Sequence, residues 1–392
     1  MKKATKDTFS LVVGGPFWRL QQRLGLLGPD RLPPMSTALL FAAIAWLPPA
    51  LLSLAHGTAW SESLGGRAFL FDFTAYARFT ISIVMLVLME RIAEGRIAEL
   101  FHQVSAAGLV PPDELSRLTA ALQRADRRSS SALAEAIILG IAYAASVYGL
   151  FVQVSELDES WIGSMVDVHV QLSLAGRWAL LVSLPLFWFL VLRWFWRFVV
   201  WTRLLWDLAK LNLRLVATHP DRCGGIGFLG LYPPMFAALV FALSCVTASA
   251  ALQVILFADW SLRSLAAPFL AWVALVLVFF VGPLCVFAPT LLRLKKQALL
   301  TYGVLASEHN RAFERKWVQG GKTGKDALGT PDVSSLAELA TAVELIRTMR
   351  VIPAGLEAII PLLIAIGLPW LAVVATQLPV MELLTIVVKA LL

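Results

Sequence analysis

Charged side chains and glycines are concentrated in one short stretch, THPDRCGGIGFLG, between two long apolar runs. Its polar candidates are His219, Asp221 and Arg222. Gly224 and Gly225 permit positive φ angles, so backbone N–H groups there are suited to hold an anion or a lipid phosphate in a binding or gating loop. The alternative, which we favour, is a tight turn in which Asp221 and Arg222 satisfy loose backbone groups, because no strand precedes the stretch as phosphate-binding motifs require.

The last long apolar run is the second place where residues could do chemistry. Pro361 removes a helical donor and thereby frees the backbone carbonyl of Glu357. Pro369 does the same for the carbonyl of Ala365. Freed carbonyls inside a membrane need partners or a water-filled cavity, and a carboxylate such as that of Glu357 is costly there. We therefore expect this helix to line a pore; the alternative is a packing kink in which Glu357 pairs with Arg350.

Tryptophan and arginine alternate toward the end of the fourth apolar run. Arg193, Arg197 and Trp201 share one helix face, so cation–π contacts are expected. Because these side chains lie at the inner boundary of the run, the pattern predicts an aromatic belt that contacts lipid head groups. The irregular arginine spacing is not typical of a voltage sensor. Glu135 lies one turn inside its own helix, and we expect it to pair with a nearby basic group.

The composition is that of a membrane protein. Hydrophobic residues make up 58% of the 392 residues and charged residues 15%, and the mean hydropathy is +0.75. Seven continuous apolar runs are long enough to cross the hydrocarbon core as helices, and none alternates as a barrel strand would. We predict an all-α integral membrane protein with spans at 37–55, 70–89, 132–153, 178–200, 234–257, 267–290 and 354–376.

Lysine and arginine are distributed very unevenly between the two sides of these spans. A cytoplasmic N-terminus places 28 of the 33 basic residues on the inner side, the arrangement that the positive-inside rule favours. The C-terminus then lies outside, and the net charge of +7 requires no nucleic acid as a partner. The predicted parts are a cytoplasmic amphipathic segment 1–36, a seven-helix domain 37–378 with a cytoplasmic helical subdomain made of the extensions 90–131, 201–233 and 293–352, and an outer surface segment 379–392.

Motifs of enzymes and metal sites are missing from the sequence. It contains neither HExxH nor GxSxG, and its five histidines are scattered over both predicted faces. The three cysteines suggest no disulfide or metal framework. We therefore expect no enzymatic activity, no cofactor and no bound metal.

The pattern ARF…HPDRCGGIGFLG, together with the Trp-rich span before the loop, resembles a group of uncharacterised bacterial multi-pass membrane proteins. The resemblance covers about Ala38 to Ala237 and implies a location in the bacterial inner membrane, without a function. The predicted architecture is also similar to that of insect odorant and gustatory receptor channels. Those have seven helices, an inside N-terminus, inward-projecting helices that form a shared anchor, and a last helix that lines a central pore in a tetramer. This second likeness is one of topology alone.

The sequence thus leads to one preferred function and two alternatives. The preferred function is a homo-oligomeric, ion channel-like protein whose pore involves the last spanning helix. The first alternative is a transporter or a protein that binds a lipid or small molecule. The second is a membrane signalling scaffold whose cytoplasmic helices bind a partner. In each case the expected partners are membrane lipids, and for the channel also further copies of the chain.

Overall fold

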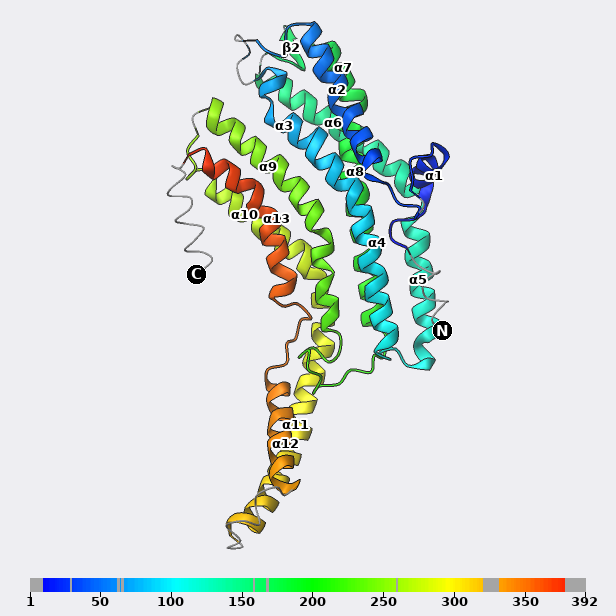
Figure 1. The fold of residues 1–392 in the computed structure, drawn as a ribbon, viewed down its shortest axis with the longest axis vertical. Coiled ribbons are helices and arrows are strands. Elements are labelled where there is room, and N and C mark those ends of the chain that lie inside the picture. The colour runs from blue at the N-terminus through cyan, green and yellow to red at the C-terminus, as the bar shows by residue number, and fades with distance from the viewer. Residues whose placement is uncertain are drawn as a thin grey trace.

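A computed structural model describes residues 10–28, 30–61, 64, 67–157, 159–166, 169–258, 260–319 and 331–377. Within these residues, seven helical stretches are long and apolar enough to cross a membrane. They are Met35–Ala55, Phe73–Val104, Ala132–Val152, Leu174–Ala209, Gly227–Phe257, Ala266–Val318 and Leu356–Ala375. The predicted all-α chain with seven apolar spanning helices is confirmed (Figure 1).

The spanning helices form one bundle with two sides (Figure 1). One side holds α2 (Met35–Ala55), α6 (Ala132–Leu157) and two longer helices, each of which contains a π-helical turn. In the first, α3 (Phe73–Tyr76) continues through the turn Ala77–Ser82 into α4 (Ile83–Ala106). In the second, α7 (Leu174–Trp178) continues through the turn Ala179–Ser183 into α8 (Leu184–Ala209). The other side holds α9 (Ala237–Phe257), which follows the 3₁₀ turns Gly227–Leu231 and Pro233–Phe236, together with α10 (Ala266–Val281) and α13 (Leu356–Ala375). Helix α9 joins the two sides, because it packs against both α13 and the helix that contains α3.

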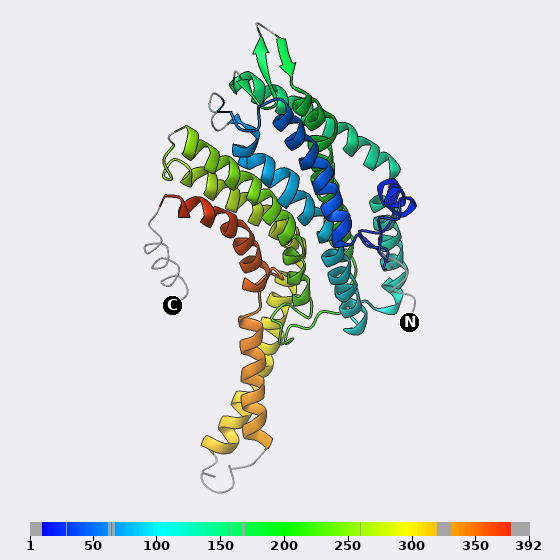
Figure 2. The ribbon, with the colours of Figure 1, turned by 45° about the horizontal axis from the view of Figure 1, so that its top comes forward.

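The two ends of the bundle differ in structure (Figures 1 and 2). At the sheet end, three short antiparallel strands, β1 (Glu159–Ser160), β2 (Gly163–Val166) and β3 (His169–Leu172), pair in the order β1-β2-β3. At the opposite end, which we call the hairpin end, α11 (Ala288–Phe313, followed by a π-helical turn to Val318) and α12 (Pro331–Arg347) lie side by side and project beyond the bundle. The sequence did not predict the sheet.

Two helices on the flank of the bundle complete the fold. Helix α1 (Gly15–Arg23) packs against α6, and α5 (Leu115–Ser129) packs against α8. Both are amphipathic: α1 buries Trp18 and α5 buries Leu118 and Leu122, while their charged residues face outward. Their apolar stripes recur at helical spacing, which is why these short segments dock on the bundle as helices.

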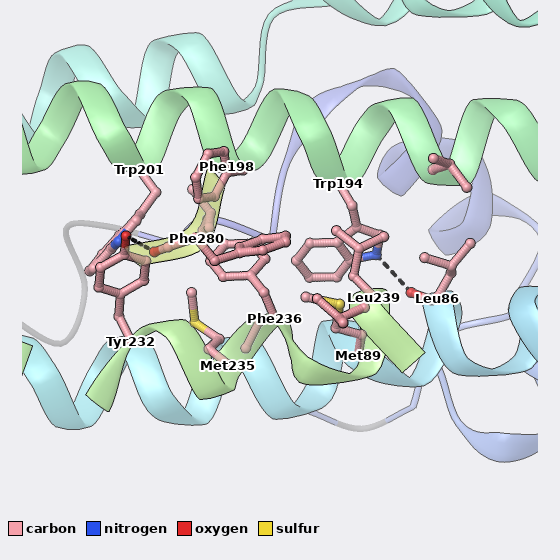
Figure 3. Close-up of a cluster of buried hydrophobic side chains, with 14 of the residues drawn as sticks. Leu86, Met89, Trp194, Phe198, Trp201, Tyr232, Met235, Phe236, Leu239 and Phe280 are labelled. Atoms are coloured by element: carbon pink, nitrogen blue, oxygen red, sulfur yellow. Dashed lines mark hydrogen bonds between the residues drawn. The ribbon is translucent and has the colours of Figure 1, made fainter. Parts of the chain in front are cut away.

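Aromatic side chains fill the centre of the bundle between α8, the start of α9 and α10 (Figure 3). The cluster consists of Trp194, Phe198, Trp201, Tyr232, Phe236 and Phe280, all at most 4% exposed. Two of its polar groups bond to backbone carbonyls: Trp194 Nε1 donates to the carbonyl of Leu86 over 2.8 Å, and the Tyr232 hydroxyl donates to the carbonyl of Phe280. The buried Trp201 Nε1 has no acceptor among the described residues. Rings of this size bury large areas, so the cluster fixes the positions of α4, α8 and α9 relative to one another.

The predicted helical extensions are partly corrected. Of the predicted helical extension 201–233, only the first part continues the fourth helix, because α8 ends at Ala209. The chain then runs without regular structure toward α4 and α5, where Arg214 N–H donates to the carbonyl of Leu109 and Asn212 donates to Glu114. These contacts stabilise an extended path that a further helical turn would break. The described residues after α4 and α10 include the helices α5, α11 and α12, and the predicted outer segment 379–392 lies outside the described residues.

Candidate functional site

Four charged side chains meet inside the bundle. Glu90 of α4 accepts hydrogen bonds through Oε1 from Arg193 Nη1 at 2.5 Å and Arg197 Nη1 at 3.0 Å. Arg193 Nε lies 3.4 Å from Oε1 of Glu135 at the start of α6. The four side chains are only 3–8% exposed. Three helices therefore contribute to one buried ion-pair network, which we call the charge cluster.

The described N-terminal segment covers the charge cluster. The backbone N–H of Phe17 donates to Glu135 Oε2 over 2.7 Å, and Arg193 lies over the Phe17 ring at 4.9 Å. Nearer the start of the chain, Arg197 Nη2 donates to the carbonyl of Val12 over 3.1 Å. Ser10 donates to the carboxylate of Glu94, one turn after Glu90 on α4 (2.7 Å). These contacts hold residues 10–17 as a strap across the three helices.

The structure corrects the prediction that Arg193, Arg197 and Trp201 contact lipid head groups. All three are buried within the bundle, at 4%, 2% and 1% exposure. The two arginines turn inward because Glu90 and Glu135 supply counter-charges, which offset the cost of removing guanidinium groups from water. The cation–π partners also differ from those expected: Arg197 lies over Trp194 at 4.6 Å, and Trp201 instead packs against Tyr232 and Phe101.

Two carboxylate oxygens of the charge cluster accept no hydrogen bond from the residues that the structure describes. They are Oε2 of Glu90 and Oε1 of Glu135, and both atoms are buried. A buried acceptor without a donor costs about 1–3 kcal/mol, more when it is charged. The expectation that Glu135 pairs with a basic group is confirmed, but the pairing leaves capacity for one further donor.

An apolar cavity of about 690 Å³ adjoins Glu135. Its walls come from α1, α6 and the helix formed by the second π-helical turn and α8. Among the described residues that line it, Glu135 is the one that carries a charge. The apolar and aromatic lining residues are Pro16, Phe17, Leu20, Ala132, Ala136, Leu139, Tyr143, Leu181, Val182, Pro185, Leu186 and Phe189. The cavity wall is thus apolar along its length, and Glu135 lies at the end where α6 begins.

The loop between α8 and α9 forms a turn around the carboxylate of Asp221. Its Oδ1 accepts the N–H groups of Cys223 at 2.8 Å and Gly225 at 3.1 Å, and its Oδ2 accepts that of Gly227 at 2.8 Å. His219 Nδ1 lies 2.9 Å from Oδ1. Burial would raise the pKa of Asp221, but the three N–H groups and His219 together lower the pKa below its ordinary value.

The loop also attaches the α12–α13 connection to the bundle. Arg350 N–H donates to the carbonyl of Arg222 over 2.7 Å, and Arg350 Nη2 donates to the carbonyl of Asp221. Arg222, Gly224 and Gly225 adopt φ angles of 56°, 69° and 96°, so the chain reverses tightly here. Because the Asp221 carboxylate already accepts the N–H groups of Cys223, Gly225 and Gly227, the geometry is that of the favoured structural turn and not of an open anion site.

Helix α13 carries the predicted pore residues. Glu357 lies in its first turn with a 45% exposed side chain, 3.4 Å from Arg350, which is the ion pair that we considered as the alternative to a pore role. Pro361 and Pro369 both lie inside the helix, and Ala365 is buried against the bundle. The predicted residues thus lie along one helix, but only Glu357 presents a charge.

The comparisons with known proteins assign no relative. The sequence matches no family model, and no curated protein or solved structure is significantly similar to it. Among the residues that the structure describes, no group of histidine, cysteine and carboxylate side chains is placed to hold a metal ion. The charge cluster and its cavity therefore become the candidate site on geometry alone.

Proposed function

We propose that this protein binds an amphiphile, taken from the bilayer, in the cavity between α1, α6 and α8. The observation that carries the proposal is the cavity of about 690 Å³ with a buried, incompletely hydrogen-bonded carboxylate at one end. Ligand sites have volumes of about 300–1,000 Å³, apolar walls and a few polar groups that fix orientation. This assigns the chain to the lipid-binding or transporter class.

The length of the cavity suits a hydrocarbon chain. Its lining follows α6 from Ala132 to Tyr143, a distance of about 16 Å at 1.5 Å per helical residue. The Tyr143 hydroxyl donates to the carbonyl of Leu181 over 3.1 Å and so links α6 to the opposite wall at the far end. A chain entering beside Glu135 would contact only apolar side chains along this path.

The distribution of charge supports an orientation in which the hairpin end faces the cytoplasm of a bacterium. The positive-inside rule favours that side for the lysine-rich and arginine-rich segments. Glu135 then lies near the inner head-group region, and α1, with its apolar and charged faces, lies along the membrane surface. A ligand of the inner leaflet would reach the cavity laterally, with its head group under the strap.

Filling the cavity tests the proposal. Ala136 lines the cavity and is solvent- or lipid-exposed, so Ala136→Trp should occupy the space without disturbing the packed core. We expect the variant to lose about nine-tenths or more of the lipid that co-purifies with wild type, since a side chain would take the place of the chain (about 1.4 kcal/mol per tenfold). Native mass spectrometry measures the retained ligand.

The matched control is Ile137→Trp, the next residue of α6, which is 53% exposed and does not line the cavity. It adds the same indole to the same helix and should retain ligand as wild type does. Equal retention by Ala136→Trp, Ile137→Trp and wild type would remove the cavity from consideration as a binding site.

A homo-oligomeric channel is the second candidate function, and one edge of the molecule favours it. Helix α13 packs on α9 and α10 and leaves an apolar outer face that includes Ile364 and Leu368, 58% and 56% exposed. The projecting hairpin exposes Leu300 and Val304 of α11, at 75% and 61%. Exposed apolar side chains on a segment outside the bundle indicate an interaction surface. If further copies of this chain cover that surface, several α13 helices come together.

A scaffold that binds another protein through the hairpin is the third class of function.

In a channel, Glu357 would stand at the inner mouth of the pore. Glu357→Gln should then lower cation selectivity at low salt, because a carboxylate at a mouth concentrates cations. Reversal potentials in bilayers with asymmetric salt measure this change, with Glu338→Gln on the exposed side of α12 as the control. Unchanged selectivity in an otherwise conducting protein would exclude Glu357 from the pathway.

A further inference from the structure

We infer that the head group bound at Glu135 carries a protonated amine with N–H donors. This inference rests on the proposed cavity function and specifies the chemical class of its ligand. The argument uses the charge balance of the cluster, the kind of hydrogen-bonding capacity it leaves open, and the position of Glu135 at the head-group end of the cavity.

The first observation is an excess of negative charge. The region holds three carboxylates, Glu90, Glu94 and Glu135, against two guanidinium groups. Glu94 interacts electrostatically with both Arg197 and Glu90, so its charge is counted together with the charges of the cluster. The nearest basic side chain of α1, Arg19, donates Nε to the carbonyl of Gly15 in its own helix and does not line the cavity. The four buried side chains balance, and Glu94, which is only half-buried, makes the carboxylates of the region outnumber the guanidinium groups by one. Uncompensated charge is costly where it is shielded from water.

The second observation concerns the open hydrogen-bonding capacity. Two polar atoms of the cluster take part in no hydrogen bond among the described residues, Glu90 Oε2 and Glu135 Oε1, and both are acceptors. Glu135 Oε1 is held only by its ion pair with Arg193 Nε, 3.4 Å away. Both guanidinium groups are engaged: Arg193 contacts Glu90 and Glu135, and Arg197 contacts Glu90 and the carbonyl of Val12. The open hydrogen-bonding positions of the cluster are therefore acceptors, and the N–H groups of an amine can donate to them.

Other head groups satisfy these two requirements less well. A phosphate or carboxylate head would meet the Glu135 carboxylate with like charge in a region of low dielectric. A hydroxyl donates a hydrogen bond but leaves the charge excess in place. A trimethylammonium group compensates charge but has no N–H donor. A primary ammonium supplies both, and charge-assisted hydrogen bonds to carboxylates are the stronger class.

Single-chain probes that differ only in the head group test the inference. Tetradecylamine, tetradecanol and myristate are titrated against wild type in detergent, and displacement of a fluorescent alkyl probe reports affinity. We expect the amine to bind about tenfold or more tightly than the alcohol, and the carboxylate to bind most weakly. Nanodiscs of phosphatidylcholine doped with phosphatidylethanolamine or phosphatidylglycerol then ask, by native mass spectrometry, whether a bilayer lipid with an amine is the source.

The possible outcomes separate this inference from the proposed function. Equal affinity of all three probes, lost in Ala136→Trp, would retain the cavity and overturn the amine. Absence of displacement by any probe would overturn both. Glu135→Gln should abolish the preference for the amine while the alcohol still binds; if that variant does not fold, the ranking of probes on wild type decides alone. Enrichment of phosphatidylglycerol over phosphatidylethanolamine would also contradict the inference.

Discussion

Glu90→Ala is expected to lower the free energy of unfolding by about 3–5 kcal/mol, the usual cost of removing one partner from a buried ion pair. Glu90 Oε1 receives both Arg193 and Arg197, whose side chains are 5% and 3% exposed. Without Glu90, the two buried guanidinium groups lose the carboxylate that both contact, and the ion pair of Arg193 with Glu135 is the one that remains to them among the described residues. Reversible unfolding in mixed micelles measures the change.

The matched control for Glu90→Ala is an ion pair on the surface with equally good geometry. Asp30 and Arg91 are 2.5 Å apart, but their side chains are 43% and 47% exposed. Asp30→Ala should cost no more than about 1 kcal/mol, because exposed pairs contribute little. Equal effects of the two substitutions would mean that the charge cluster is hydrated and does not hold α4, α6 and α8 together.

Asp221→Ala is expected to cost about 2–3 kcal/mol, because it leaves backbone donors of a tight turn without their acceptor. The carboxylate serves the N–H groups of Cys223, Gly225 and Gly227 at once, and its side chain is only 21% exposed. Asp221→Asn keeps one acceptor oxygen and should lie between wild type and the alanine variant. A cost below that of Asp30→Ala would contradict the assignment of this turn as the attachment of the α12–α13 connection.

The stabilisation by Asp221 should also depend on pH. The pKa of Asp221 is lowered in the folded protein, so the carboxylate contributes stability above the unfolded value of about 3.9 and loses it as pH falls through the lower folded value. Wild type and Asp221→Ala should therefore converge in stability below about pH 4.

The seven spanning helices could be predicted because continuous apolar runs of that length have few other solutions. The helix ends could not be predicted equally well. The apolar and basic pattern after Ala209 continues at helical spacing, but the contacts of Asn212 and Arg214 with residues near Pro112 decide the path, and they are about 100 positions distant in sequence. The sheet at 159–172 was missed because its strands are too short for an alternating pattern.

The candidate site was only partly visible in the sequence. Arg193 and Arg197 were identified, but Glu90 lies directly after an apolar run and is indistinguishable there from a residue that faces the cytoplasm. Only the packing of α4 on α8 shows that its carboxylate is the centre of the cluster. The turn at Asp221 could be predicted from the sequence, because the glycines and the pre-proline position define a local reversal. The cavity could not be predicted, because the residues that line it come from distant segments between Pro16 and Phe189.

Direct imaging of the particle in lipid nanodiscs tests the central claim, that an amphiphile occupies the cavity. The expected map contains elongated density between α6 and α8, running from Glu135 toward Tyr143, with a compact feature within hydrogen-bonding reach of the carboxylate. The same density should be missing in Ala136→Trp and present in Ile137→Trp. A cavity closed by the side chains of α1, or one filled no differently from the lipid around the rest of the bundle, would contradict the claim and shift attention to α13 and the projecting hairpin.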